Sequence, residues 1–539
     1  MKYIFMLIKI RQILLPLDYE DNDIKLAAAA KLGCSKNILS AVKIIRRSID
    51  ARKRREAPVF SVTAEIEILN DFILPEDVDI EQIREATVPA ETNIRKIPGK
   101  TNKPVIVIGA GPSGLMAALV LAEAGLSPLL IERGAPVKER TLQVSQFWKN
   151  GTLNPESNVL FGEGGAGLFS DGKLTSRSKN RSGVRRFLET LVKCGAEEDI
   201  LIDAEPHLGS DLLRQIVQSF RNLIETKGGE IRFNSCLEGI HIEKKKLAGI
   251  IVNGKEIETG HCLLACGHSA RDIYTMLAKS SVMLEPKSFA AGVRLEFSQK
   301  LINRAQWGRF AGHPHLGAAP FRLTFKKDKL HRACYTFCMC PGGTVISCSS
   351  SHGALTTNGM SLSKRSGNFG NAAFLVPVDP SDYQLKKDKV NIALAGIDFQ
   401  EKMERSSYAE GGSDYSLPAA SLSGFLTKKY TDVLTQNRSW KKARPADLHN
   451  ILPDFICETL TVAIPKMLSF MDGIIPEETL LYAAETRSSS PYRILRNESG
   501  ESVSVSGLFP AGEGAGYAGG IVSSAVDGIM AAQAVIRSL

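Results

Sequence analysis

The stretch that decides the fold is residues 104–125, PVIVIGAGPSGLMAALVLAEAG. A short apolar run, three glycines in Gly-x-Gly-x-x-Gly spacing and an apolar helical pattern predict a buried strand, a tight turn and a helix. The first glycine permits the turn, the second lets a diphosphate approach the backbone, and the third lets the helix pack against the strand. The helix N-terminus directs free N–H groups toward the phosphates. The expected contacts are Gly109, Gly111, Pro112, Ser113 and Gly114.

An acid ends the next predicted strand, residues 128–132. Glu132 lies 18 residues beyond Gly114, close to the roughly 20 that separate such a turn from the acid that binds a ribose. A carboxylate accepts hydrogen bonds from two sugar hydroxyls and repels a 2′-phosphate. The sequence therefore favours FAD or NAD over NADP at this site.

Three further segments favour FAD over NAD. They are residues 132–140 (ERGAPVKER), the glycine-rich loop 161–173 (FGEGGAGLFSDGK) and residues 507–532 (GLFPAGEGAGYAGGIVSSAVDGIMAA). Backbone N–H groups of a loop so rich in glycine are free to line a phosphate or a flavin edge. The three segments resemble the FAD-containing members of the glutathione-reductase-like superfamily.

This resemblance implies a set of cofactor contacts. In the superfamily the C-terminal acid binds a ribityl hydroxyl, a backbone strand touches the adenine, and a helix N-terminus stabilises negative charge on the reduced flavin. Two positions depart from the superfamily pattern, since Glu513 stands where Asp is commoner and Cys266 replaces Thr. The implied contacts are Arg133, Arg140, Gly164, Gly165, Ala166, Leu237, Gly267, Gly512, Glu513, Gly519, Gly520 and Ile521.

Shorter motifs along nearly the whole chain resemble one particular family, the uncharacterised FAD-dependent dehydrogenases with an N-terminal α/β extension. These motifs are SIDAR at residues 48–52, CGHSARD at 266–272, FCMCPGG at 337–343 and NGMS at 358–361. The resemblance implies FAD and oxidoreductase chemistry, and it implies no particular substrate.

The fold class that follows is α/β, with a Rossmann-type FAD-binding domain split in sequence. A mixed α+β substrate domain interrupts it, and a small α/β domain precedes both. The predicted limits are 1–90 for the N-terminal domain, 91–103 for a linker, 104–285 and 481–539 for the FAD-binding domain, and 286–480 for the substrate domain.

In the N-terminal domain, alternating apolar residues predict strands at Ile8–Leu15 and Val59–Ile68, with a helix at Ile24–Leu32 between them. Ser35 is a candidate cap for a second helix, Lys36–Arg55, that is rich in Lys and Arg. Such a basic face could bind RNA. A charge run is more often a solvated face, which is the interpretation that we favour.

Three groups besides the flavin are candidates for chemistry, and none is assigned a catalytic role. Cys338 and Cys340, with Cys334 nearby, form either a redox pair or, as we favour, small packing residues. His268 is either an acid–base group or a structural histidine, which we favour. Arg487 could hold an anionic substrate or a flavin carbonyl, or belong to a structural loop.

Composition limits the location and the partners. A net charge of +9 suits an anionic ligand, and ten scattered cysteines without zinc-site spacing indicate a reduced cytoplasmic protein with no metal. No apolar run is long enough to cross a bilayer. We expect hydride transfer between a small-molecule substrate and flavin N5; the alternatives are a flavoprotein that acts on tRNA or other RNA through the basic N-terminal domain, and a non-catalytic FAD-binding redox sensor. Because no second dinucleotide motif follows, NAD(P)H could bind only transiently.

Overall fold

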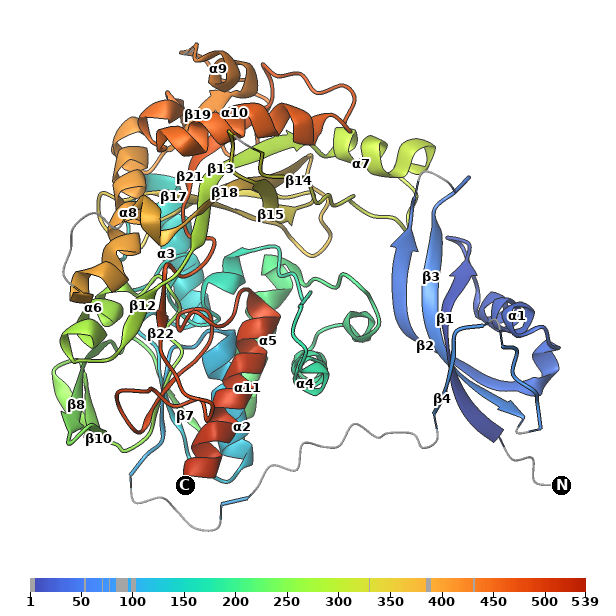
Figure 1. The fold of residues 1–539 in the computed structure, drawn as a ribbon, viewed down its shortest axis with the longest axis horizontal. Coiled ribbons are helices and arrows are strands. Elements are labelled where there is room, and N and C mark those ends of the chain that lie inside the picture. Colours follow the sequence, from blue (N-terminus) through green and yellow to red (C-terminus); the bar gives the residue numbers. More distant parts are fainter. Residues whose placement is uncertain are drawn as a thin grey trace.

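The computed structural model has three parts (Figure 1): a small N-terminal domain, a domain built on a central parallel sheet, and a second domain that packs against it. It describes residues 5–52, 55–69, 71–76, 78–83, 96–97, 103–328, 330–383, 389–429 and 432–539. The predicted linker lies largely outside these ranges.

The central sheet is fully parallel and has the order β23-β11-β5-β6-β7. Its strands are β5 (Ile106–Ile108), β6 (Leu129–Ile131), β7 (Glu230–Arg232), β11 (Cys262–Leu264) and β23 (Leu508–Pro510). The first strand of the unit lies in the middle and the chain crosses over to both sides, as in doubly wound sheets. The strand expected at the start of residues 104–125 and the strand expected at 128–132 are present as β5 and β6.

Both faces of this sheet are covered, which explains the nearly unbroken apolar runs. One face packs against α2 (Pro112–Glu123), α4 (Arg181–Lys193), α5 (Gly209–Thr226) and α11 (Ile521–Ser538). The other packs against α6 (Arg271–Lys279) and a three-stranded sheet of β8 (Leu237–Glu243), β9 (Lys246–Val252) and β10 (Lys255–Glu258). Helix α3 (Val137–Asn150) follows β6.

The second part, here called the cap domain, is built on a seven-stranded sheet of order β14-β15-β18-β13-β21-β19-β20. The strands are β13 (Phe289–Ser298), β14 (Thr324–Phe325), β15 (Cys334–Cys340), β18 (Phe369–Val378), β19 (Leu417–Ser421), β20 (Ala443–Pro445) and β21 (Leu480–Glu485). The helices are α7 (Gln299–Trp307), α8 (Lys389–Glu410), α9 (Leu422–Thr427) and α10 (Asp454–Leu468). A hairpin of β16 (Thr344–Cys348) and β17 (Thr356–Met360) lies beneath the sheet, and β12 (Leu284–Pro286) pairs with β22 (Tyr492–Ile494).

The predicted limit of the cap domain at residue 480 is wrong. Strand β21 (Leu480–Glu485), which the prediction places in the FAD-binding domain, pairs with β13 and β19 inside the cap sheet. An apolar strand carries no sign of which sheet it will join, so the sequence could not place this boundary.

The N-terminal domain is an antiparallel sheet, β2-β3-β1-β4, with one helix. Its elements are β1 (Phe5–Leu15), α1 (Asp21–Leu32), β2 (Leu39–Asp50), β3 (Val59–Leu69) and β4 (Ile80–Ile83). Apolar side chains of α1, β1 and β3 form its core. The strands predicted at Ile8–Leu15 and Val59–Ile68 are confirmed as β1 and β3, and the helix predicted at Ile24–Leu32 is confirmed as α1.

The predicted second helix, Lys36–Arg55, is wrong. Ser35 caps only a single 3-10 turn, Lys36–Ile38, and the chain then continues as β2. Val42 and Ile44 face Ile66 and Ala64 of β3 across the ladder. Pairing along a partner strand overrides the weak helical preference of this segment.

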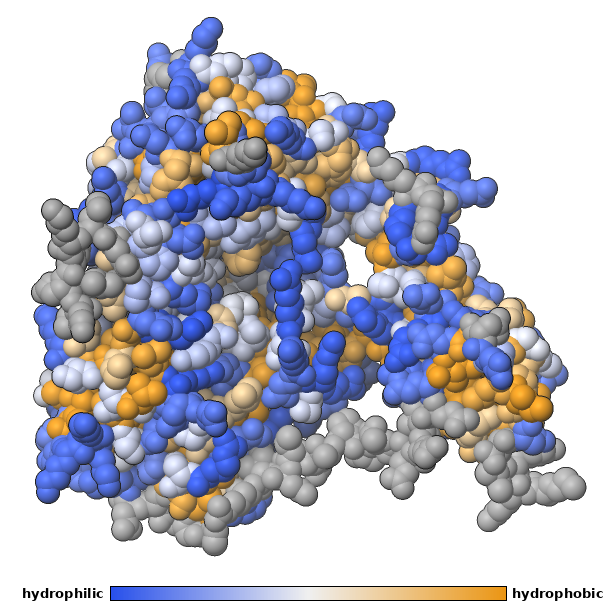
Figure 2. Space-filling model, viewed as in Figure 1, coloured by the Kyte–Doolittle hydropathy of each residue, from blue (hydrophilic) through white to orange (hydrophobic). Residues whose placement is uncertain are grey.

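The N-terminal domain contacts the rest of the chain at residues 199–204 and at residues 307–316. Arg47 exchanges backbone hydrogen bonds with the segment 202–204, and its guanidinium pairs with Asp199 and Asp203. At the second contact Asp18 faces His313. Figure 2 shows that an opening remains between this domain and the body of the molecule.

Among the described residues, no helix is both long and apolar enough to cross a membrane.

A buried ion pair links the central strands of the cap sheet. Arg294 on β13 forms two hydrogen bonds of 2.7 Å to Glu485 on β21, and both residues are buried. Its other donors reach Asn371 Oδ1 at 2.8 Å and Asn358 Oδ1 at 3.1 Å. The pair is therefore fully bonded and out of solvent, which is the situation in which losing one partner is costly.

Replacing Arg294 with Met is expected to lower the free energy of unfolding by about 3–5 kcal/mol, because Glu485 would keep a buried charge without its partner. Urea unfolding of the purified variant measures the loss. The double variant Arg294→Met, Glu485→Leu removes both charges and should regain most of the stability. A single variant as stable as the wild type would contradict this account of the cap sheet.

Candidate cofactor and substrate site

A deep cavity lies where the carboxyl ends of β5, β6 and β11 meet the cap domain, the place where doubly wound sheets bind ligands. Its lining runs from the β5–α2 turn to β17 and β21 of the cap domain, so residues of both domains line one continuous cavity.

The turn between β5 and α2 can be built only with glycine at two positions. Gly109 has φ +98°, and a Cβ there would lie 2.5 Å from the carbonyl oxygen of Ala265 on the neighbouring strand end. A Cβ on Gly114 would collide with the carbonyl oxygen of Gly109. These two glycines shape the turn, and Gly109 also lines the cavity.

Gly111 and Ser113 fit a diphosphate. Gly111 caps α2 with ordinary extended dihedrals, and a Cβ there would meet only Gly165 Cα, at 3.9 Å. The missing side chain therefore leaves space in the cavity itself. Ser113 Oγ is buried without a hydrogen-bond partner in the described part of the chain. A phosphate oxygen at the helix N-terminus would satisfy it.

A second helix N-terminus reaches the cavity at α11. Gly520 caps this helix with φ +88°, and Gly520, Ile521 and Ser524 line the cavity. The preceding turn is fixed by Asp527 inside the helix, whose Oδ2 accepts the N–H of Gly512 at 2.7 Å. Two partial positive charges thus face one cavity from opposite domain segments.

The carboxylate of Glu132 joins two loops. Its Oε2 accepts the N–H of Ala110 at 2.7 Å, while Oε1 accepts those of Gly134 and Gly162 at 2.9 and 3.0 Å. The side chain is buried and lines the cavity. Glu132 therefore stands at the expected place beside a sugar, with most of its acceptor capacity already used by backbone.

Arg140 lies beneath the cavity and does not line it. Its guanidinium is completely buried and donates to five carbonyl oxygens, those of Asn158, Val159, Gly162, Glu163 and Gly165. Burial lowers its pKa to about 9, against the pull of two nearby carboxylates. Arg140 thus holds the glycine-rich loop in shape from below.

The far end of the cavity has the character of an adenine site. Leu237 and Cys236 line it at the start of β8. Arg133 is fixed there by a bidentate bond to Asp272, and its guanidinium lies 4.6 Å from the ring centroid of Phe161. These groups form a flat, partly apolar wall.

Most of the sequence-predicted contacts meet in this one cavity. Those that line it are Gly109, Gly111, Pro112, Ser113, Glu132, Arg133, Gly165, Ala166, Leu237, Gly267, Gly512, Glu513, Gly520 and Ile521. Gly114, Arg140, Gly164 and Gly519 do not line it. Gly114, Gly164 and Gly519 lie in the loops or helix start that carry lining residues, and Arg140 lies on α3 beneath the glycine-rich loop.

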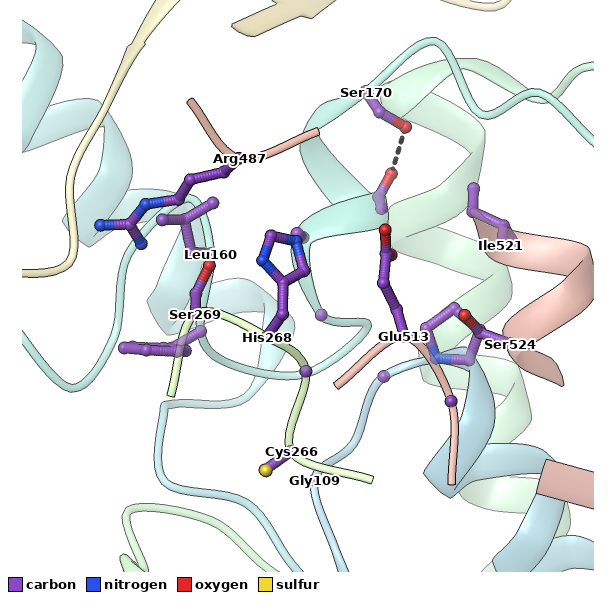
Figure 3. Close-up of a pocket in the computed structure, with 18 of the residues that line it drawn as sticks. Gly109, Leu160, Ser170, Cys266, His268, Ser269, Arg487, Glu513, Ile521 and Ser524 are labelled. Atoms are coloured by element: carbon purple, nitrogen blue, oxygen red, sulfur yellow. Dashed lines mark hydrogen bonds between the residues drawn. The ribbon is translucent and has the colours of Figure 1, made fainter. Parts of the chain in front are cut away.

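Near α11, Glu513 and His268 point into the same space (Figure 3). Burial raises the pKa of Glu513 to about 7, opposed by the N–H of Gly520 and the charge of Lys287. Burial and the neighbouring charges of Arg487, Arg271 and Lys287 lower the pKa of His268 to about 3. His268 is therefore neutral near pH 7, and Glu513 is shared between its two forms.

The cap domain contributes a part of the cavity that the sequence did not reveal. Thr356, Thr357 and Asn358 of β17 and Glu485 of β21 line it. From below comes Lys173, whose Nζ lies 2.6 Å from Asp171 Oδ2. The signal that could have found part of this set is a charged residue inside an apolar strand, as at Glu485.

The three cysteines of the FCMC segment have different positions. Cys334 is buried in the cap core, whereas Cys338 and Cys340 line the cavity. Burial raises the pKa of the Cys340 thiol. A protonated thiol is a poor nucleophile, so this position favours the packing interpretation for Cys340.

The basic segment predicted to be a helix is a strand with much of its charge paired. Arg47 bonds to two aspartates, and Arg52 and Arg55 both bond to Asp50. Lys43 lies opposite Glu65 on β3. Lys53 and Arg54 fall outside the described residues. This pairing weakens the case for a nucleic-acid surface.

Models of three protein families match the chain. One described as "FAD-dependent protein, C-terminal domain-like" matches residues 288–488, and one described as "FAD binding domain" matches residues 102–161. A domain of unknown function matches residues 7–67. The FAD-binding match covers the β5–α2 turn, Glu132 and the start of the glycine-rich loop.

Similar proteins were found both by sequence and by structure. An uncharacterized protein of Clostridium beijerinckii is 42% identical over 540 residues, which cover 99% of each chain. A chain of the quinol fumarate reductase of E. coli gives a TM-score of 0.37 at 12% identity, over 81% of this chain and 70% of that one. A geranylgeranyl bacteriochlorophyll reductase-like protein of Thermoplasma acidophilum gives 0.34 at 12% identity, over 82% and 79%.

The cofactor is FAD. The family matches identify it, and the residues present fit it. The glycine cradle with the unpartnered Ser113 hydroxyl suits the diphosphate, Glu132 lines the cavity where it would adjoin the sugar, and the start of α11 suits the flavin ring.

Gly111→Ala is expected to weaken FAD binding by about 10- to 100-fold, through lost charge-assisted N–H bonds to phosphate, while the fold is kept. The new methyl group meets no protein atom closer than 3.9 Å and fills the cavity instead. Fluorescence titration of cofactor-free protein with FAD measures the change. Gly260→Ala, outside the cavity and with open space around it, is the control. Equal affinities for the two variants would contradict the cradle.

Glu513 gives a pH-dependent prediction for the cofactor-free protein. Its pKa is about 7 when folded and 4.5 ordinarily, so across this window the folded chain keeps a proton that the unfolded chain has lost. Wild-type stability should therefore fall relative to Glu513→Gln as pH rises from about 4.5 to about 7. Thermal unfolding at several pH values measures the difference. Glu225→Gln, on the exposed face of α5, is the control, and its stability should change with pH as that of the wild type does. A Glu513→Gln variant with the same pH dependence as the wild type would refute the assignment.

Proposed function

Because this chain belongs to the family of FAD-binding proteins that includes its Clostridium beijerinckii relative, we propose that it is an oxidoreductase that transfers hydride between flavin N5 and a small-molecule substrate. One observation carries the proposal. A single cavity extends from the diphosphate cradle to a chamber lined by the cap domain. Bound FAD supplies the redox chemistry there.

The residues of the chain position the cofactor and the substrate and stabilise charge on them. The N-terminus of α11 offers backbone N–H groups to developing negative charge on the ring edge. Glu513 lies at this helix start and takes or releases a proton near neutral pH. His268 stays neutral and presents one donor and one acceptor nitrogen to the cavity. We assign no catalytic base among them.

The cap domain provides the substrate's side of the cavity. Its lining combines hydroxyl and amide groups of β17 with the ion-paired Glu485. Hydrogen-bonding groups in a mainly apolar pocket orient a small molecule. A nicotinamide donor would enter by the same opening and leave before the substrate binds.

Anaerobic titration of the FAD-bound protein tests the proposal. NADH, NADPH or a member of a substrate panel is expected to bleach the oxidised flavin spectrum, and an acceptor should restore it. Gly111→Ala loaded with less FAD should bleach in proportion to its flavin content. A flavin that dithionite reduces but that no donor bleaches would count against an enzyme and favour a redox sensor.

A further inference from the structure

We propose that the substrate carries an anionic group, a carboxylate or a phosphate, that binds against Arg487 at the cap side of the cavity. The proposal rests on the function proposed above and adds the chemical class of the substrate. It follows from how the charges beside the cavity are paired.

Two guanidinium groups share one carboxylate in this wall. Glu404 on α8 is completely buried and accepts two hydrogen bonds of 2.8 and 2.9 Å from Arg271. It accepts two more of 2.9 Å from Arg487. Glu401, 3.5 Å from Arg271, is paired with Arg405 at 3.2 Å. The group therefore carries one more positive charge than its carboxylates balance.

Arg487 lines the cavity and keeps N–H donors that no described residue uses. A guanidinium has five N–H groups. Two bind Glu404, and a third binds Ser350 Oγ at 2.8 Å. The remaining two have no partner in the described part of the chain, although the side chain is only 6% exposed and lines the cavity. Two unpaired donors on a buried guanidinium suit the two oxygens of an anion.

His268, which follows β11, is the second group of the proposed anion site. It lines the cavity beside Arg487, and no described residue hydrogen-bonds its ring (Figure 3). Its neutral form has one N–H to donate. Lys287, which lies near Glu513 and has no carboxylate within salt-bridge distance among the described residues, adds to the positive field. An uncompensated charge out of water is costly until a counter-charge arrives.

Binding of probe anions to the oxidised, FAD-bound protein tests this. Malonate, inorganic phosphate and neutral malonamide are titrated at constant ionic strength, and the flavin spectrum and thermal midpoint are followed. Malonate or phosphate should bind saturably, and whichever binds more tightly identifies the group. Arg487→Met should weaken binding by about 10- to 100-fold. Arg487→Lys keeps the charge but loses the paired N–H donors of the guanidinium, so its anion affinity should lie between those of the wild type and Arg487→Met.

Arg271→Met is the matched control. It removes the same charge from the same cluster, but its side chain does not line the cavity, so anion affinity should fall clearly less than in Arg487→Met, because the excess charge is lost while the donors of Arg487 remain. Absence of saturable anion binding, or equal weakening in Arg487→Met and Arg271→Met, would overturn the proposal. So would an Arg487→Met protein with unchanged anion affinity and a shifted flavin potential. Because binding is measured without turnover, failure of the redox function would be seen separately, in the titration with electron donors.

Discussion

The cavity depends on two buried charges, the Glu132 carboxylate and the Arg140 guanidinium, that hold its glycine loops together. Loops without ladder or helical pairing leave backbone N–H and C=O groups unsatisfied, which is costly out of water. Glu132 accepts three such N–H groups and Arg140 donates to five such carbonyls. The carboxylate and the guanidinium thus satisfy the backbone groups that a helix or a β-ladder would otherwise satisfy. The loops can then bring their backbone close to a diphosphate.

The sequence predicted the parts of the fold whose signal is local. Short apolar runs predicted the strands β5 and β6, because a parallel strand buried on both faces is a short, almost unbroken apolar run. The segment 39–50 was misassigned because its apolar spacing suits a helix or a strand, and pairing with β3 decides between them. The cap boundary failed for a related reason, since the partner of β21 lies almost two hundred residues away at β13.

The same division holds for the site. The diphosphate cradle lies within one strand–turn–helix unit, so spacing alone located Gly111 and Ser113. Arg140 was predicted as a ligand contact because it follows the acid in a familiar motif, yet its position on the inner face of α3 directs it to loop carbonyls. On the cap side the sequence gave Arg487 as a candidate anion contact but not its partner, because Arg487 and Glu404 become neighbours only when α8 packs beside β21.

The two ends of the cavity follow different electrostatic rules. At the cofactor end Arg133 is balanced by Asp272 and Glu156, and the phosphates of FAD would meet uncharged N–H groups. At the cap end Arg487 must share Glu404 with Arg271. Replacing such a cluster with apolar residues of similar volume is often neutral or stabilising. The excess positive charge at Arg487 is therefore explained better by an anionic substrate that binds there than by a contribution of the cluster to stability.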